Sequence, residues 1–94
     1  MWTVRQSKRF ARQYKKLRDK TAADVDAAVA AVQLDPHGGE RKEGDLATLW
    51  VHKFRSSGQL YLLGYTLDDG IQLVYLEAAG PHENFYRDVK RAVK

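Results

Sequence analysis

The sequence predicts an α+β fold in which an N-terminal helical hairpin packs on a small antiparallel sheet and a short helix ends the chain. Three observations lead to this prediction. Apolar residues recur at helical spacing between residues 7 and 34, strand-like patterns fill residues 49 to 78, and two turn signals divide that second stretch into three. Helices followed by a run of strands indicate an α+β domain, with the helices expected on one face of the sheet.

The first predicted elements are a short strand and a helix. Trp2 to Val4 is expected to be extended, and the helix is expected to begin at Ser7, a residue type that caps helix N-termini. Phe10, Tyr14 and Leu17 then recur at i, i+4 and i+7. They therefore share one face of the helix, and their basic neighbours point elsewhere.

A second helix is predicted to begin at Thr21, because its hydroxyl can cap and Asp24 three residues later suits the positive end of the helix dipole. The apolar face of this helix comprises Val25, Ala28, Val29 and Val32. The segment 35–39, Asp-Pro-His-Gly-Gly, ends it because proline cannot continue the hydrogen-bond ladder. The two helices should form a hairpin.

Three strands are then expected to form an antiparallel meander, which the N-terminal strand completes. Turn signals at Ser56-Ser57-Gly58 and Asp68-Asp69-Gly70 separate strands over residues 49–55, 59–67 and 71–78. In the first strand, alternation divides the side chains between two faces: Trp50, His52 and Phe54 on one, and Val51, Lys53 and Arg55 on the other. A short helix is predicted from about Glu83.

Composition excludes several classes of protein. The 94 residues suffice for one domain, expected over residues 1–94. The absence of cysteine excludes disulfides, thiolate metal sites and cysteine nucleophiles. No histidine or carboxylate pair has metal-ligand spacing and no phosphate-binding glycine motif occurs, so no metal and no cofactor are expected. Without a signal peptide or an apolar run of roughly 20 residues, the chain is expected in the cytoplasm, with no membrane partner.

Basic residues are concentrated at the N-terminal end of the chain. Eight of the 16 Lys and Arg residues fall in the first 20 positions, and the formal net charge is +4. Such a distribution attracts polyanions, nucleic acid above all, or an acidic protein. The alternative is a solvated helix face without a binding role. The candidate RNA-binding residues are Arg9, Arg12, Lys16, Arg87 and Lys90.

Several segments resemble the RelE/ParE superfamily of bacterial type II toxins. Lys53-Phe54-Arg55-Ser56-Ser57-Gly58 is similar to the Lys-x-Arg-Ser-Ser-Gly segment of RelE. Gly80-x-His82 followed by Phe85-Tyr86 is similar to the C-terminal segment of the branch that cleaves mRNA on the ribosome. Gly44-Asp45-Leu46 and the run from Glu83 to Asp88 look like the signature of one RelE-like subgroup. The resemblance covers essentially the whole chain and implies a RelE-like fold.

Metal-independent RNA cleavage suits the residues in these segments. In this reaction the 2′-hydroxyl attacks the neighbouring phosphate, so a base, an acid and cations are needed. His82 is the candidate for proton transfer, because the ordinary pKa of histidine lies near working pH. Lys53 and Arg55 suit the stabilisation of charge. Tyr86, four residues after His82, can stack on a base or donate a proton.

Each of these residues also has a structural interpretation. His82 can cap its helix, Tyr86 and Phe85 can pack that helix against the sheet, and Lys53 and Arg55 can form a solvated strand face. His52 is expected to be structural, because it shares a face with aromatic residues, and His37 is expected to be exposed in its turn.

The resemblance also implies partners. A cognate antitoxin would neutralise the toxin, the ribosome and mRNA would be its targets, and operator DNA would be bound only through the antitoxin complex. RelE-type enzymes usually carry an arginine on the strand after the Ser-Ser-Gly turn, but residues 59–65 are Gln-Leu-Tyr-Leu-Leu-Gly-Tyr. Lys53, Arg55 or Arg87 must then supply the missing phosphate contact. Two alternatives remain, a ParE-type inhibitor of DNA gyrase and a degraded toxin that only binds its antitoxin.

Overall fold

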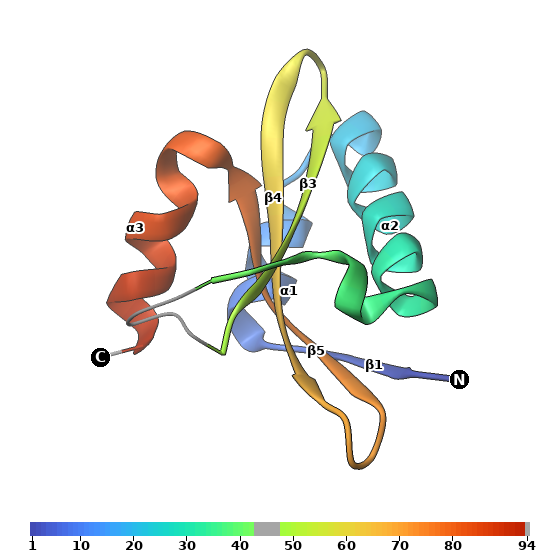
Figure 1. Cartoon of the computed structure of the whole chain (residues 1–94). Coiled ribbons are helices and arrows are strands. Elements are labelled where there is room, and N and C mark those ends of the chain that lie inside the picture. The colour runs from blue at the N-terminus through green and yellow to red at the C-terminus, as the bar shows by residue number, and fades with distance from the viewer. Residues whose placement is uncertain (43–47, 94) are drawn as a thin grey trace.

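The computed structural model of the chain describes residues 1–42 and 48–93, with the side chains of residues 88 and 90–93 excepted. Gly44-Asp45-Leu46, one of the segments on which the resemblance rests, lies outside the described residues. Figure 1 shows a central sheet between helices. The elements, in chain order, are β1 (Thr3–Gln6), α1 (Lys8–Lys15), α2 (Asp19–Leu34), the 3₁₀ helix η1 (Pro36–Gly38), β2 (Glu40–Arg41), β3 (Trp50–Ser56), β4 (Gln59–Asp68), β5 (Leu73–Pro81) and α3 (His82–Val93).

The sheet has five strands in the order β1-β5-β4-β3-β2. The meander β3-β4-β5 is antiparallel, as predicted, and the two-residue strand β2, where no strand was predicted, extends it. The N-terminal strand also joins the sheet as expected, but it pairs with β5 in parallel. This direction follows because α1 and α2 return the chain across the sheet before the meander begins (Figure 1).

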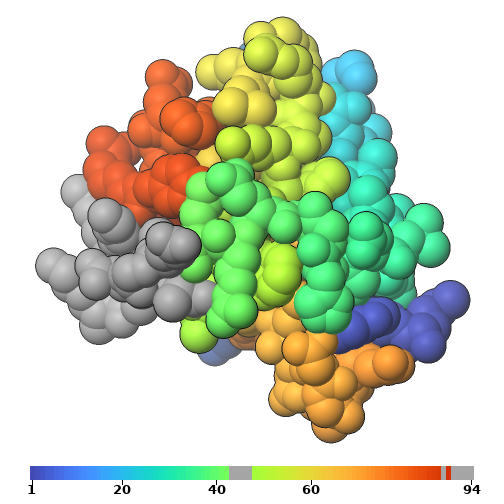
Figure 2. All heavy atoms as spheres, viewed as in Figure 1, coloured from blue at the N-terminus to red at the C-terminus, as the bar shows by residue number. Residues whose placement is uncertain are grey.

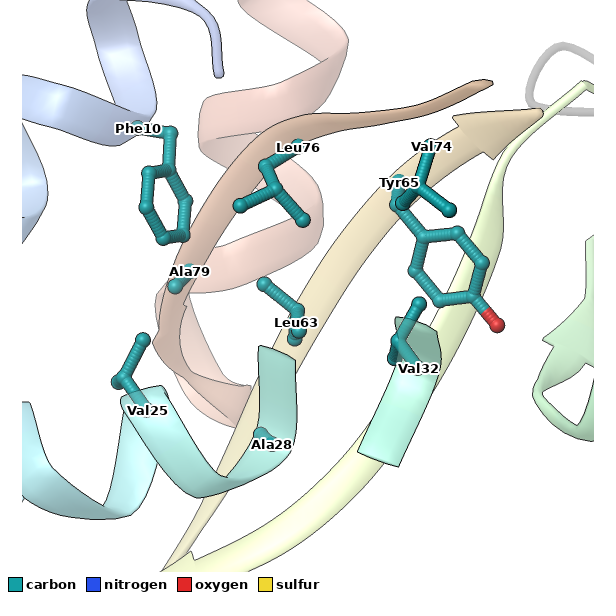
Figure 3. Close-up of a cluster of buried hydrophobic side chains, with 9 residues drawn as sticks. All are labelled: Phe10, Val25, Ala28, Val32, Leu63, Tyr65, Val74, Leu76 and Ala79. Carbon is teal, nitrogen blue, oxygen red and sulfur yellow. The ribbon is translucent and has the colours of Figure 1, made fainter. Parts of the chain in front are cut away.

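The helical hairpin covers one face of the sheet. Its main apolar cluster is drawn in Figure 3, where α1 and α2 face side chains from β4 and β5. The members of this first cluster are Phe10, Val25, Ala28, Val32, Leu63, Tyr65, Val74, Leu76 and Ala79. The apolar face predicted for the second helix is therefore confirmed, with Val29 partly buried beside the cluster.

The third helix covers the opposite face, so the expectation that all helices lie on one face is wrong for α3. A second buried cluster joins α3 to the strands and consists of Leu49, Val51, Leu62, Ala78, Phe85 and Val89. The reason lies in β4, where the neighbouring residues Leu62 and Leu63 point to opposite faces and are both fully buried. A sheet that is apolar on both sides requires a cover on both sides.

The helix starts confirm one capping prediction and correct the other. Ser7 caps α1, since its hydroxyl oxygen accepts a hydrogen bond of 3.0 Å from the backbone N–H of Phe10. The second helix begins at Asp19 rather than at Thr21, and its N-cap residue provides no side-chain bond. Thr21 is buried, and its hydroxyl oxygen accepts a hydrogen bond from Ser56 on β3 at 2.9 Å. The Thr21 hydroxyl, which the sequence predicted to cap the helix, thus forms a tertiary contact with β3 instead.

Tyr65 connects the core to the segment after α2. Its side chain is fully buried, and its hydroxyl donates a 2.7 Å hydrogen bond to the carbonyl oxygen of Pro36. Burial raises the pKa of this phenol. Gly39 is required beside it, because a Cβ atom at that position would collide with the Tyr65 hydroxyl.

We expect Tyr65→Phe to lower the free energy of unfolding by about 1–3 kcal/mol, because the buried carbonyl of Pro36 loses its donor. Chemical denaturation measures the loss. Tyr75→Phe is the matched control. It also removes one hydroxyl, but Tyr75 is exposed, so the free energy of unfolding should not change. Equal stability of the two variants would contradict the structural role of the Tyr65 hydroxyl.

Candidate functional site

The strand register places the two basic residues of β3 on the face that α3 covers. Lys53 pairs with Leu62 of β4, which in turn pairs with Gly80 of β5. Paired residues share a face, and Leu62 belongs to the cluster under α3. Lys53 and Arg55 are both exposed, so this face continues beyond the apolar cluster as a charged surface.

The junction between β5 and α3 positions His82 and Tyr86. β5 ends at Pro81, and α3 begins directly at His82, one residue before the predicted start. The two rings lie one helical turn apart, with centroids separated by 6.1 Å in an edge-to-face arrangement. His82 is exposed and Tyr86 is half-buried, so both remain accessible from solvent.

Phe85 holds this helix against the sheet. It is 2% exposed, and its ring lies over Gly64 of β4, where an added Cβ atom would come within 2.6 Å of Phe85 Cζ. The ring of Tyr86 packs edge-to-face on Phe85 at 5.1 Å. The packing interpretation is therefore correct for Phe85, whereas Tyr86 lies at the margin between the cluster and solvent.

Lys53 is paired with a residue that sequence reasoning missed. The distance from Lys53 Nζ to Glu40 Oε2 is 3.2 Å, and from Lys42 Nζ to Glu40 Oε1 it is 3.5 Å. A hydrogen bond from Lys53, followed by the charge of Lys42, lowers the pKa of the Glu40 carboxyl. Lys42 also lies 5.2 Å from the centre of the Tyr86 ring. These contacts connect β3, β2 and α3 in one polar cluster, defined as Glu40, Lys42, Lys53 and Tyr86.

Glu40 and Lys42 lie in a polar segment for which the sequence predicts neither a strand nor a functional residue. In Figure 2 the green segment that contains them lies beside the orange-red α3. Their spacing of two residues was the available signal, because it places both side chains on one face of an extended chain. The proximity of Lys42 to Tyr86, which is more than 40 positions away in the chain, had no local signal.

The other predicted cations are distributed more widely. Arg55 points toward the β3–β4 turn, where its Nη1 donates to the carbonyl oxygen of Gly58 at 3.3 Å. Arg87 donates to Asn84 Oδ1 at 3.2 Å on α3. The side chain of Lys90 lies outside the described residues.

Three candidate RNA-binding residues lie at the N-terminal helix. Arg9 is half-buried, while Arg12 and Lys16 are exposed. Lys16 lines a shallow pocket together with Gly80 and Asn84, so it approaches the start of α3 past the end of β5. The structure thus places Lys16 near the β5–α3 junction, whereas Arg9 and Arg12 belong to the helical hairpin on the opposite face.

The remaining histidines lie away from the polar cluster. His52 is half-buried, its ring stacks with that of Phe54 at a centroid distance of 6.3 Å, and burial lowers its pKa. His37 is exposed, as predicted, and its Nε2 lies 2.7 Å from Asp69 Oδ1. The His37 ring also contacts the rings of Trp2 and Trp50 edge-on.

Two further findings concern ligands and membranes. Among the side chains that the structure describes, no three from His, Asp or Glu are grouped so that they could hold a metal ion. Among the helices that the structure describes, none is long and apolar enough to span a bilayer.

Comparison with solved structures defines the class to which this fold belongs. The isolated RelE toxin of E. coli is 22% identical, with a TM-score of 0.71 over 98% of this chain and 99% of that chain. The toxin–antitoxin complex RelBE2 of Mycobacterium tuberculosis contains a chain that is 26% identical, with a TM-score of 0.72 over 86% of this chain and 98% of that one. The matched chain of the intact E. coli RelBE complex is 21% identical, with a TM-score of 0.71 over 85% of this chain and 95% of that chain. The fold is that of RelE toxins.

The family follows from the sequence itself. The family model described as the ParE-like toxin of type II bacterial toxin-antitoxin systems matches residues 4–90. The chain therefore belongs to this family, which confirms the predicted membership of the RelE/ParE superfamily. Among curated proteins, no significant match was found.

Proposed function

We propose that this toxin is a metal-independent endoribonuclease that cleaves mRNA on the ribosome and thereby inhibits translation. The observation that carries the proposal is the contact chain on the α3 face. His82 contacts Tyr86, Tyr86 contacts Lys42, and Glu40 joins Lys42 to Lys53. A group able to transfer protons, an aromatic ring and two cations therefore lie on one exposed surface, as RNA cleavage requires.

The chemical roles follow from these positions. His82 exchanges a proton with the 2′-hydroxyl or the departing 5′-oxygen, and Tyr86 stacks on a base or assists proton transfer. Lys53 stabilises the charge that develops on the phosphate, because an ammonium beside the reacting group favours the transition state. Arg55 also stabilises the phosphate, after RNA binding breaks its hydrogen bond to the carbonyl oxygen of Gly58. Arg87, Lys90, Arg9, Arg12 and Lys16 contribute further contacts to RNA.

A cognate antitoxin is the proposed protein partner. The solved complexes of RelE with RelB in E. coli and of RelBE2 in Mycobacterium tuberculosis support this, because the chain shares the fold of their toxins. We further propose that the pair acts in the cytoplasm and that operator DNA is bound only through the antitoxin complex. Inhibition of DNA gyrase is the competing function, since it also requires an accessible surface but no proton transfer.

An in vitro translation reaction, with and without the purified protein, tests the proposal by primer extension on the mRNA. We expect new ends at codon-phased positions that appear only when ribosomes are present. Pre-incubation with the co-expressed antitoxin should abolish the ends. Intact mRNA, together with inhibition in a gyrase supercoiling assay, would contradict the nuclease and favour the gyrase function.

A further inference from the structure

Glu40 lies between two lysines in a way that resembles the binding of a phosphate. Its Oε2 atom is 3.2 Å from Lys53 Nζ, and its Oε1 atom is 3.5 Å from Lys42 Nζ. Each oxygen therefore faces a different ammonium group. The two non-bridging oxygens of a phosphodiester have a similar arrangement, since both carry negative charge and diverge from one central atom.

The sheet register holds the two lysines in this arrangement. Glu40 pairs with Val51, two residues before Lys53, and the backbone N–H of Lys42 donates to the carbonyl oxygen of Leu49 at 2.9 Å. Residues two apart on paired strands share a face, so the three charged side chains converge on the side of α3. Backbone pairing thus fixes where the side chains of both lysines leave the sheet.

Charge in this group favours an anion from outside. Two lysines oppose one carboxylate, which leaves an excess positive charge. A hydrogen bond with Tyr86, with a further contribution from Glu40, raises the pKa of Lys42. The side chains of Glu40 and Lys53 are 53% and 50% exposed, respectively, and exposed ion pairs are weak and easily exchanged.

We propose that Lys42 and Lys53 together bind one backbone phosphate of the RNA, and that the Glu40 carboxylate occupies this site until RNA displaces it. The inference rests on the proposed function and adds Lys42 to its binding residues. Lys42 supplies a cation that no residue between Gln59 and Tyr65 provides on β4. Because Lys42 also contacts Tyr86, phosphate bound there would lie next to His82 and Tyr86.

Binding of a non-cleavable RNA tests this inference separately from catalysis. The probe is a fluorescein-labelled oligonucleotide with 2′-O-methyl groups, and fluorescence anisotropy gives its Kd. We expect Glu40→Gln to lower the Kd about 2- to 5-fold, because the internal competitor loses its charge. Lys42→Gln should raise the Kd and reduce the slope of log K against log salt by about 0.7, the value for one lost phosphate contact on a single strand.

Asp69→Asn is the control for net charge. It removes the same single negative charge, but at the turn between β4 and β5, the far end of β5 from α3. A purely structural role of Glu40 would weaken binding on substitution, so tighter binding by Glu40→Gln alone supports displacement. In the Lys42→Gln background, Glu40→Gln should increase the affinity for the oligonucleotide less than it does in the original protein.

The outcomes separate this inference from the proposed function. If the original protein binds the oligonucleotide but Glu40→Gln binds no more tightly than Asp69→Asn, the displacement is overturned and the nuclease stands. An unchanged salt slope in Lys42→Gln would overturn the phosphate contact in the same way. A protein that fails to bind the oligonucleotide at low salt would overturn the phosphate site alone, because the nuclease is overturned only by intact mRNA in the reaction that contains ribosomes.

Discussion

Replacing His82 by alanine is expected to lower the rate of mRNA cleavage by about 10²–10⁴-fold, the range for loss of a general acid or base. Stability should not change, because the His82 side chain is exposed and its removal leaves no cavity. Primer extension in a ribosome-containing reaction measures the rate, and a thermal unfolding curve verifies the fold.

His52→Gln provides the matched histidine control. His52 lies outside the polar cluster, and its ring stacks on Phe54, so cleavage should continue at the original rate. Equal cleavage by His82→Ala and the original protein would assign proton transfer to another group, with Lys53 or Tyr86 the nearest candidates. Equal loss in both variants would indicate a general effect on folding.

Replacing Phe85 by alanine is expected to destabilise the protein by about 3–5 kcal/mol and to detach α3 from the sheet. Phe85 is buried beneath this helix, and its ring fills the space over Gly64. Detachment would separate His82 and Tyr86 from Lys42 and Lys53, so cleavage should fall together with stability. Amide hydrogen exchange reports the protection of α3, while fluorescence of Trp2 and Trp50 follows the first cluster.

Gly64→Ala tests the packing of Phe85 against β4 from the side of the strand. The added methyl group would lie 2.6 Å from Phe85 Cζ, so either α3 or β4 must shift, at a cost of about 1–3 kcal/mol. Phe85→Leu in the Gly64→Ala background should recover part of this loss, because the shorter side chain makes room. Normal protection of α3 in Phe85→Ala, or no recovery in the double variant, would contradict this packing.

Local patterns in the sequence account for most of the elements. Ser7 starts a helix through a hydroxyl that bonds three residues ahead, and the turns at residues 56–58 and 68–70 rely on residue types that favour turns. The pairing of His82 with Tyr86 follows from a spacing of four on a helix. Each of these features depends on neighbours within a few positions, which is the range over which sequence patterns are informative.

Local patterns do not determine which helix covers which face of the sheet. Residues 62 and 63 are both leucine, so alternation alone does not say which face of β4 is covered by which helix. The irregular register between Gly64 and Tyr65 shifts the later half of β4 against β5. The parallel pairing of β1 similarly follows from the path of the helical hairpin, not from the residues of β1.

Some residues of the candidate site can be predicted from the sequence, and others are found only in the folded structure. From the residues alone one obtains the superfamily, the fold class and the identities of His82, Tyr86, Lys53 and Arg55, because type and spacing are local properties. Only the folded chain places Lys42 beside Tyr86, sets Glu40 between Lys42 and Lys53, and turns Arg55 toward Gly58. The physical reason is that such contacts arise from strand register and helix docking, which depend on the packing of both apolar clusters at once.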